Sequence, residues 1–525
     1  MHKHSDTWDP LHFVLRQHKK LQKYKGAGRA PAANGGRKRN MFKAGKRPSA
    51  DLLSGDEGWV IFRFSVPIIL SYLLQQIYTI SDAAICGQTL GVDDIAGVND
   101  VYPILFIFLQ FAVGCTAGFS VITSIAAGRG DQARVRRSFA VQLVLGGVLS
   151  LALTGIAIWT LRPLLRFIGL SEANPGVWRA AYQYSLVIFI GIFAQLYYNL
   201  ICSVLRSLGD STTPLVFLLF STVLNIGLDL LFILVFRLGV IGAAAATVLA
   251  QAVSAVTCLL YAFGKYPELH LSGQDFHAEL SVYAQHLGQG LPMGLQFSVL
   301  AIGIIVMQRA LVGFDIGQDG IMAAGNPAQN GFGAANKLNN FLMCPMNALS
   351  TAIVSFNAQN LGAGRQDRIR RGTGKSLLIG LAMYLVLGGT GMLLTINGAY
   401  QYLFMSADKI TAATIRYGNL YLYVDLSMYF ALMILFVFRS GVQGVGHAEF
   451  ALVAGCAELV ARVLICAFLP KLVNGGAIDS SASVGAYIAL CFADPGAWIL
   501  AVVSLIYPVT RYLLGGARRK SGGNG

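Results

Sequence analysis

Residues 130–137 read GDQARVRR, and residues 364–371 read GRQDRIRR. The two octapeptides are about 230 residues apart, and each directly follows a long apolar segment. A second pair of stretches has a similar spacing: residues 206–214 read RSLGDSTTP, and residues 442–450 read VQGVGHAEF. Duplication of a multi-helix unit is typical of secondary transporters, in which the substrate path runs between the two repeats. The sequence therefore predicts two copies of one membrane unit.

The composition indicates a chain that lies in lipid. Of its 525 residues, 55% are hydrophobic and only 12% are charged, and the mean hydropathy is +0.59. A soluble domain carries charge on about a quarter of its residues. Apolar runs long enough to cross about 30 Å of hydrocarbon recur along the chain, and only helices satisfy their backbone groups in that environment. We therefore predict an all-α integral membrane protein with twelve transmembrane helices.

The predicted spans are residues 60–87, 96–126, 138–161, 181–204, 214–236, 239–262, 287–312, 332–358, 376–397, 412–438, 450–470 and 484–510.

Lysine and arginine residues gather at one end of the predicted bundle. The segment before residue 60 holds thirteen of them, and the loops after the second and eighth spans hold four arginines each. The positive-inside rule therefore places both termini and the even-numbered connections in the cytoplasm. We predict a multi-pass protein of the cell membrane, in contact with the lipid bilayer. The net charge of +15 then indicates topology rather than nucleic-acid binding.

The predicted organisation is two six-helix lobes with flanking tails. Residues 1–59 are expected to form a disordered, basic cytoplasmic tail, and residues 511–525 a basic cytoplasmic C-terminal tail. The N-lobe covers residues 60–263, a cytoplasmic linker that we expect to act as a hinge covers 264–286, and the C-lobe covers 287–510. Because six is an even number, both lobes enter the membrane in the same sense. A pseudo-two-fold axis along the membrane normal therefore relates them.

A group of polar residues lies inside apolar spans of the N-lobe, where a charge costs about 3 kcal/mol or more and normally marks an ion or proton path. Asn225 and Asp229 are four residues apart, so a helix stacks them on one face. At about 1.5 Å per residue, Asp82, Asp229 and Thr247 all fall roughly 8 to 12 Å below the outer surface. Their oxygens predict a coupling site for a proton or for a hard cation such as sodium. The alternative is that the pair only hydrogen-bonds neighbouring helices.

Other polar residues are candidates for the lining of a substrate cavity. Asn336 and Asn340 lie on one face of the eighth span, and Gln75 and Gln296 lie in the first and seventh. Asp425 lies among tyrosines in the tenth span, where its charge and the ring faces would hold a cationic compound. Tyrosines near a membrane boundary also serve as interfacial anchors, so both interpretations stay open.

Two further charges predict a structural role rather than substrate contact. Glu458 and Arg462 are four residues apart in the eleventh span, which predicts an ion pair along one helix that faces the bundle interior.

Residues 374–376 read GKS, but residue 369 is Ile where a phosphate-binding loop needs glycine. The eight cysteines show no C-x-x-C spacing. We therefore predict a protein that is not an enzyme and needs no cofactor beyond its coupling ion.

Several motifs resemble one family of transporters. They are IYTISDAAICGQTLG (residues 77–91), LRSLGDSTTP (205–214), VLNIGLDLLFI (223–233), GVIGAAAATVLAQ (239–251) and AANKLNNFLMCPMNALSTAIVSFNAQNLGAGRQDRIR (334–370). Together they are similar to the multidrug and toxic compound extrusion (MATE) transporters over about residues 60–510. The resemblance implies a twelve-helix, two-lobed exchanger that expels organic cations and other drugs in return for sodium ions or protons. We expect a monomer whose partner is a small-molecule drug or toxic organic compound.

Within the family, the sequence is closer to the DinF-like branch than to the NorM-like branch. NorM-like members carry a glutamate in the seventh helix, where this chain reads LPMGLQFSVLAIGIIVMQ at residues 291–308. DinF-like members place their coupling cluster at positions that match Asp82, Asn225, Asp229 and Thr247. The resemblance thus implies a coupling site in the N-lobe and casts doubt on a carboxylate cation site in the C-lobe.

Two other functions compete with drug exchange. Flippases for lipid-linked precursors belong to the same superfamily, but they usually have fourteen helices and a strongly basic cavity. A passive channel is disfavoured because the repeats and the buried carboxylates indicate coupling. Pairing the halves through Pro67 and Pro292, two possible bending points, puts Met307 opposite Asp82. We predict cation-coupled efflux by alternating access, with the coupling ion bound where the two copies differ.

Overall fold

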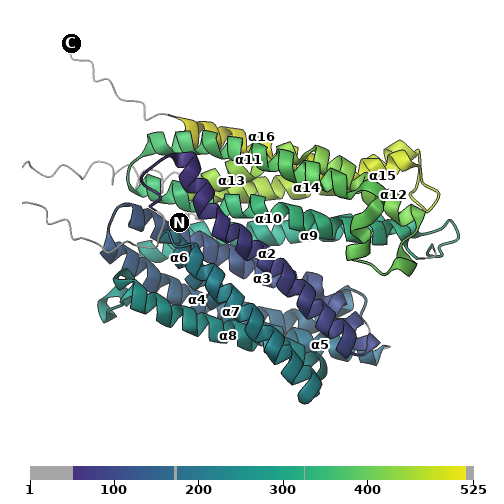
Figure 1. Ribbon diagram of the computed structural model, residues 1–525, viewed down its shortest axis with the longest axis horizontal. Coiled ribbons are helices and arrows are strands. Elements are labelled where there is room, and N and C mark those ends of the chain that lie inside the picture. The colour runs from purple at the N-terminus through teal and green to yellow at the C-terminus, as the bar shows by residue number, and fades with distance from the viewer. Residues whose placement is uncertain (1–50, 171–173, 324, 516–525) are drawn as a thin grey trace, which may run out of the picture. The chain divides into compact units, whose positions relative to one another are not determined.

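The computed structural model describes residues 51–170, 174–323 and 325–515, and the described chain is built almost entirely from helices (Figure 1). Most of each predicted tail, residues 1–50 and 516–525, lies outside the described residues. Within the described chain, β-structure is confined to an isolated bridge between Ile316 and Met322.

Ten helical segments of the described chain are long and apolar enough to span a bilayer. Two further spans are broken in the middle: α5 (Pro175–Ile190) meets α6 (Ile192–Ser207) at 45°, and α12 (Ala412–Ser427) meets α13 (Tyr429–Gly444) at 52°. Every predicted span falls on one of these segments or bent pairs. The prediction of an all-α fold with twelve spans is therefore confirmed.

The unbroken segments are α2 (Glu57–Thr89), α3 (Val92–Gly128), α4 (Gln132–Phe167), α7 (Thr212–Asp229) with η1 (Leu230–Val235), α8 (Gly239–Lys265), α9 (Leu280–Val312) with η4 (Gly313–Asp315), α10 (Pro327–Gly362), α11 (Gln366–Leu394), α14 (Ala448–Asn474), and α15 (Val484–Cys491) with α16 (Ala493–Pro508) and η7 (Val509–Leu514). Short turns complete the connections: η2 (Pro267–Leu269), η3 (Gly273–Phe276), η5 (Ile396–Leu403) and η6 (Ala407–Lys409).

A glycine accounts for the bend between α5 and α6. Gly191 separates the two helices, and a Cβ placed on it would lie 2.8 Å from Val248 Cγ1 of α8. A carbon so close would be a clash, so the missing side chain allows α8 to pack into the inside of the bend.

The packing of the helices repeats between the two halves. We call α2–α8 the N-lobe and α9–α16 the C-lobe. The helix α2 packs mainly against α10 and α7, and α9 packs mainly against α3 and α14. Likewise, α3 contacts α4, α5 and α6, as α10 contacts α11, α12 and α13. Because α2 and α9, α3 and α10, and α7 and α14 occupy equivalent places in the repeat, an approximate two-fold relates the lobes.

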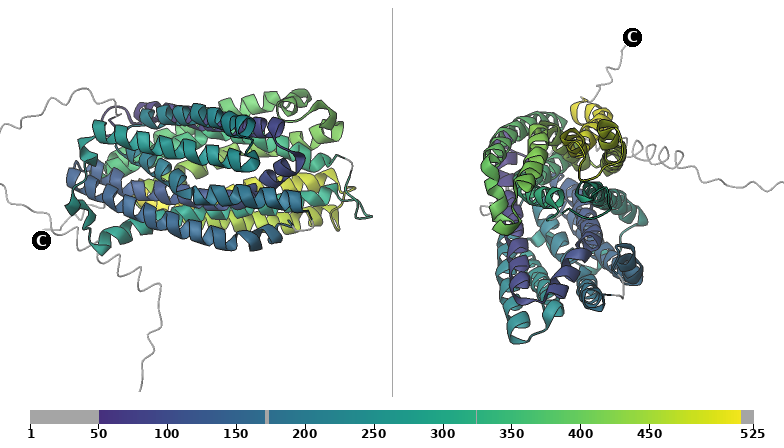
Figure 2. Two further views of the ribbon diagram at one scale, coloured as in Figure 1. Left: turned by 90° about the horizontal axis from the view of Figure 1, so that it is seen from below. Right: turned by 90° about the vertical axis from the view of Figure 1, so that its right-hand side faces the viewer.

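The first helix of each lobe therefore lies against the second helix of the other lobe. In Figure 1, α2 runs diagonally from the C-lobe helix α11 towards the N-lobe helix α5. Viewed along the bundle, the remaining N-lobe and C-lobe helices form two separate groups (Figure 2). Each lobe is thus held to the other by an exchanged helix in addition to the linker.

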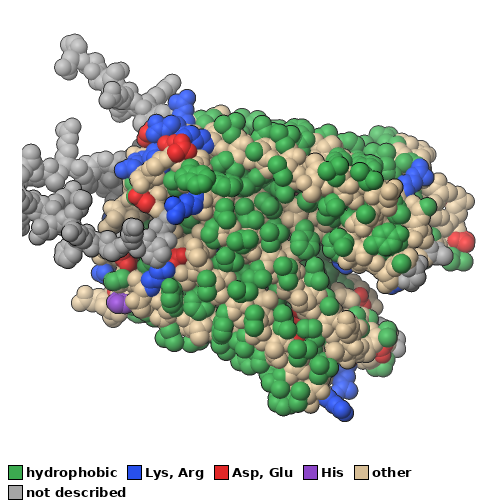
Figure 3. All heavy atoms as spheres, in the orientation of Figure 1, with side chains coloured by type: hydrophobic (Ala, Val, Ile, Leu, Met, Phe, Trp, Pro, Cys, Tyr) green, Lys and Arg blue, Asp and Glu red, His purple; other side chains and the backbone are tan. Residues whose placement is uncertain are grey.

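The two octapeptides lie at the same end of the bundle, which we call the basic end; Figure 3 shows Lys and Arg side chains gathered there. Here α3 crosses α10 with no room for side chains. A Cβ on Gly128 would lie 2.6 Å from the carbonyl carbon of Gln359, and a Cβ on Gly362 would lie 2.9 Å from that of Ile125. Gly128 and Gly362 hold equivalent places two residues before each octapeptide, so the pseudo-two-fold passes through this crossing.

The start of α2 corrects the predicted extent of the N-terminal tail. We expected disorder through residue 59, yet Leu52 is 1% exposed and belongs to the C-lobe core together with Ile61, Phe64 and Ile68 of α2. Burial of apolar side chains and hydrogen bonds to the C-lobe give residues 51–59 the ordering energy that a free polar tail lacks.

Candidate functional site

The four predicted coupling residues come from three helices of the N-lobe. Asp82 lies in the half of α2 that is remote from the basic end, which we call its outer half; the other half is its inner half. Asn225 and Asp229 lie in the last turns of α7, and Thr247 lies in α8. The helix α7 packs against both α2 and α8. Asn225 is 1% exposed and Asp229 is fully buried, because the one-turn spacing that was predicted to stack them also turns both away from the lipid.

The polar atoms of this cluster are short of partners. Both side-chain polar atoms of Asn225, both carboxyl oxygens of Asp229 and one of Asp82 are buried without a hydrogen-bond donor or acceptor that satisfies them. The carboxyl groups of Asp82 and Asp229 nevertheless lie close enough to influence each other electrostatically, and Asn225 lies beside Asp229. Two carboxylates cannot bond each other unless a proton or a cation lies between them. Unpaired buried polar atoms cost free energy, so the geometry favours uptake of a positive species.

The surroundings of the cluster are aromatic and apolar. Tyr78 of α2 donates a hydrogen bond to Thr247 Oγ1 at 3.3 Å, which joins α2 to α8 beside the carboxyl groups. Cys86, Ile233 and Ala243 form a small buried cluster on which Tyr184 of α5 packs. This apolar packing excludes water and strengthens the electrostatic attraction of the carboxyl groups for a cation.

The ligand types in the cluster match a hard monovalent cation or a proton. Two carboxylates, one amide and one hydroxyl supply only oxygen ligands, which suit sodium better than a transition metal. Across the described parts of the chain, no group of three or more His, Cys, Asp or Glu side chains is arranged to hold a metal ion. Among the described residues, the N-lobe cluster is therefore the best candidate for binding a coupling ion.

The five predicted cavity residues differ in their burial. Gln75 on α2 and Asn340 on α10 are exposed, and Asn336 is half-buried. Gln296 on α9 is 1% exposed and accepts a hydrogen bond from Gln443 at 2.8 Å, and Asp425 on α12 is fully buried. Within the described chain no hydrogen bond joins any two of these five side chains, and a shared substrate cavity stays a prediction.

Asp425 belongs to a hydrogen-bonded network inside the C-lobe. Asn339 of α10 donates to its Oδ2 at 2.8 Å and accepts a hydrogen bond from Tyr429, and Tyr421 donates to Asp494 at 3.2 Å. The second oxygen of Asp425 is buried and has no partner among the described residues. Tyr421 and Tyr429 are thus buried core residues rather than interfacial anchors, whereas Tyr423 is exposed.

The predicted ion pair between Glu458 and Arg462 is wrong. Glu458 instead pairs with Arg439 of α13 at 2.7 Å, and Arg462 pairs with Asp494 of α16. A Cβ on Gly303 of α9 would lie 3.3 Å from Arg462 Cδ, so a glycine makes room for that side chain. Neighbouring helices offer each charge a partner at closer range than the same helix does.

The sequence reading missed Asp494 and Arg439. The signal for Asp494 was present, because it is an acidic residue within the apolar span 484–510. Arg439 lies one residue beyond the predicted span 412–438, so it did not stand out as a charge within the membrane.

Comparison with known proteins agrees with this fold. A family model described as MatE matches residues 67–231 and 324–468, which is more than half of the chain. The chain therefore belongs to the MATE family of multidrug and toxic compound extrusion transporters. The resemblance found in the sequence motifs is confirmed at the level of the family.

Individual relatives are more distant. The chain is 30% identical over 307 residues to the probable multidrug resistance protein YpnP of Bacillus subtilis, a match that covers 58% of this chain and 65% of that protein. It thus spans just under two thirds of the length of this relative. It is also 23% identical over 430 residues to a FAD transporter of Shewanella oneidensis, which covers 81% of this chain and 90% of that protein.

A solved structure shares the fold. An outward-facing multidrug resistance MATE transporter matches with a TM-score of 0.75 and 20% identity, over 89% of this chain and 98% of that one. Relatives named NorM also match, among them one from Thermotoga maritima at 23% identity over 62% of this chain and 69% of that protein. The names therefore leave the branch within the family as a prediction.

Proposed function

We propose that this protein is a secondary active efflux transporter that exchanges organic, often cationic, compounds for sodium ions or protons by alternating access. The observation that carries the proposal is the cluster of Asp82, Asn225, Asp229 and Thr247, in which Asn225 and Asp229 are buried and both oxygens of Asp229 and one of Asp82 lack a hydrogen-bond partner among the described residues. Binding of a cation or proton there would neutralise charge in an apolar site. That change in free energy is what couples ion flow to the movement of the lobes.

The direction of transport follows from the arrangement of the two ends. We propose that the basic end faces the cytoplasm of a cell membrane, together with both termini, because arginine-rich loops are retained on that side. The glycine crossing of α3 and α10 closes the lobes at this end, and Figure 3 shows the lobes parting towards the opposite end. A coupling ion would therefore enter from outside in this conformation, and drug would leave to the outside.

We also place the chain nearer the DinF-like branch. The helix α9 contains no acidic residue between Leu280 and Val312, whereas the N-lobe holds both Asp82 and Asp229. This distribution supports a coupling site in the N-lobe, and we propose the monomer as the working unit.

The test is gradient-driven transport in vesicles that contain the purified protein. Ethidium serves as the cationic probe, and sodium and proton gradients are imposed one at a time. We expect Asp82→Asn and Asp229→Asn to abolish transport that wild type shows with one of the gradients. Asp93→Asn is the matched control, because Asp93 is exposed in the first turn of α3 and contributes nothing to the cluster.

Two results would contradict the proposal. Full gradient-driven transport by both Asp82→Asn and Asp229→Asn would remove the coupling role of the N-lobe cluster. Substrate flux that continues at the same rate after both gradients are dissipated would instead indicate a passive channel.

A second substrate class is worth including in the same vesicles. The FAD transporter of Shewanella oneidensis matches over 81% of this chain, more than YpnP does. FAD is a large anion, so transport of FAD but not of ethidium would replace cationic drugs as the substrate class while leaving the ion-coupling test unchanged.

A further inference from the structure

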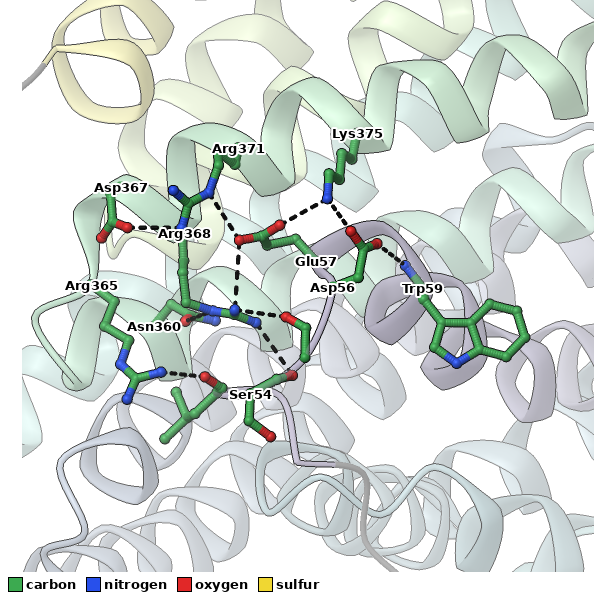
Figure 4. Close-up of polar contacts among 12 residues, drawn as sticks. Ser54, Asp56, Glu57, Trp59, Asn360, Arg365, Asp367, Arg368, Arg371 and Lys375 are labelled. Atoms are coloured by element: carbon green, nitrogen blue, oxygen red, sulfur yellow. Dashed lines mark hydrogen bonds and ion pairs between the residues drawn. The ribbon is translucent and has the colours of Figure 1, made fainter.

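The segment that precedes α2 is bound to the C-lobe, although it begins the N-lobe (Figure 4). We call residues 51–57 the strap. Asn360 of α10 donates a hydrogen bond to the carbonyl oxygen of Leu52 at 3.1 Å. Arg368 of α11 donates to the carbonyl oxygen of Gly55 at 2.9 Å. The strap therefore lies against the ends of α10 and α11 at the basic end.

Glu57 makes the strongest of these contacts. Its carboxylate is buried, and three basic groups of α11 surround it: Arg371 Nε at 3.0 Å, Lys375 Nζ at 3.0 Å and Arg368 Nη1 at 3.5 Å. Figure 4 shows the three side chains converging on Glu57 from one face of α11. Opening the strap would leave the buried charges of Glu57 and Arg368 uncompensated, which would be costly, whereas Arg371 and Lys375 are more exposed to solvent.

The two halves of α2 belong to different lobes. The inner half contributes Ile61, Phe64 and Ile68 to the core of the C-lobe. The outer half carries Asp82 and packs with α7 in the N-lobe. Any rotation of one lobe against the other must therefore act on α2 between these two attachments.

The C-lobe helix α9 is attached to the N-lobe in the equivalent place, by one ion pair before the helix and by neutral groups within it. Asp275, in the segment before α9, pairs with Arg136 of α4 at 3.8 Å. His286, near the start of α9, hydrogen-bonds Ser138 of α4 at 2.8 Å, and Ser138 hydrogen-bonds Thr123 of α3 at 2.8 Å. The charged attachment of α2 is thus one of a pair, and it is the more extensive of the two, because three basic groups contact Glu57 whereas Arg136 pairs with Asp275 at the longer distance of 3.8 Å.

We propose that Glu57 is a positioning residue of the transport cycle: it keeps the inner half of α2 fixed to the C-lobe in every state, so that lobe movement is transmitted to Asp82. This inference rests on the proposed function. Glu57 touches neither the ion nor the drug and acts through the helix. The strap is therefore a permanent attachment and not a gate that opens in each cycle.

A disulfide tests whether the strap stays closed. A Cβ on Gly58 would lie 3.4 Å from Lys375 Cβ, close to the spacing of about 3.5–4.5 Å between the Cβ atoms of a disulfide. The variant Gly58→Cys/Lys375→Cys is made with Cys456→Ser, because Cys456 is the one exposed cysteine among the described residues. We expect oxidised and reduced protein to transport ethidium at the same initial rate. Loss of transport on oxidation that reductant restores would overturn the proposal. Each single cysteine variant is the control for chemical modification.

Neutralising Glu57 tests its contribution directly. Glu57→Gln is expected to lower the maximal transport rate about tenfold with an unchanged KM for ethidium, because binding is untouched while movement is no longer transmitted. Glu57→Asp should restore part of the rate. Asp367→Asn is the matched control. Asp367 is exposed and pairs with the same Arg371 at 2.9 Å, but both residues lie on α11, so this pair does not join α2 to the C-lobe. Wild-type transport by Glu57→Gln would contradict a positioning role.

A distance measurement separates this inference from the proposed function. Phe62, Leu393 and Arg134 are exposed on α2, α11 and α4. Spin labels at Phe62→Cys and Leu393→Cys should keep one separation with and without ethidium, sodium and acid. Labels at Phe62→Cys and Arg134→Cys should change theirs. A change in the distance of the first pair overturns the strap proposal, whether or not wild type transports ethidium or FAD. Failure of wild type to transport either compound counts against the proposed function alone.

Discussion

Replacing either glycine at the crossing of α3 and α10 by alanine is expected to loosen the basic end. The added Cβ would lie 2.6 Å from the carbonyl carbon of Gln359 in Gly128→Ala, and 2.9 Å from that of Ile125 in Gly362→Ala. Non-bonded carbon atoms normally rest about 3.5–4.0 Å apart, so the two helices must separate by about 1 Å.

The cost of that separation is large on the scale of a conformational equilibrium. Overpacking a close contact costs about 1–3 kcal/mol. At about 1.4 kcal/mol for each factor of ten, a middle value of about 2 kcal/mol disfavours the closed basic end by roughly 30-fold. Because the two glycines are related by the pseudo-two-fold, both substitutions should act in the same direction and to a similar extent.

The assay is the distance between spin labels at Arg134→Cys and Arg370→Cys, on the basic-end turns of α4 and α11, with Cys456→Ser. We expect Gly128→Ala and Gly362→Ala to populate longer distances and to slow gradient-driven export of ethidium.

Gly374→Ala is the matched control, because nothing lies within 4 Å of a Cβ at this exposed position of α11. It carries the same gain in helix propensity, about 1 kcal/mol, without the clash. If Gly128→Ala and Gly374→Ala gave the same distances and the same transport rates, the crossing would not close the basic end.

Two further predictions concern stability. Arg439→Met should lower the free energy of unfolding by about 3–5 kcal/mol because it leaves Glu458 buried and without its partner. The double variant Arg439→Met/Glu458→Met should recover most of that loss. Denaturation in detergent measures both effects. Burial acts to raise the pKa of Asp210, but hydrogen bonds from Thr213 and Tyr266 outweigh it and lower that pKa. The stability that Asp210 contributes is therefore present above its unfolded pKa of about 4, and it is lost as the pH falls below that value. The difference in Tm between wild type and Asp210→Asn should therefore be larger at pH 7 than at pH 3, and a difference that grows towards pH 3 would contradict this assignment.

Much of the fold could be read from local properties of the chain. The length of an apolar run decides whether it crosses the bilayer, and no distant residue changes that requirement, so all twelve spans were found. Residues 130–137 and 364–371 likewise revealed the duplication because each repeat meets the membrane surface in the same way. The spacing of Asn225 and Asp229 gave their common face by helix geometry alone.

Partners across helices could not be read in the same way. Glu458 and Arg462 have the spacing of an ion pair, but Arg439 and Asp494 come from other helices and approach more closely. Which side chains meet between helices depends on the rotation, tilt and depth of each helix, and these follow from packing over the whole bundle. A spacing rule within one helix therefore predicted the wrong partners.

The sequence by itself determined the class of fold, the duplication and the composition of the N-lobe cluster, because hydrophobic length and the cost of a charge in lipid are properties of each segment alone. Only the tertiary structure decided that Asp82 meets Asp229, that α2 and α9 are exchanged between the lobes, and that Glu57 is held by α11. These features are contacts between residues as far as 318 positions apart, such as Lys375 with Glu57. They form only when packing brings the helices together.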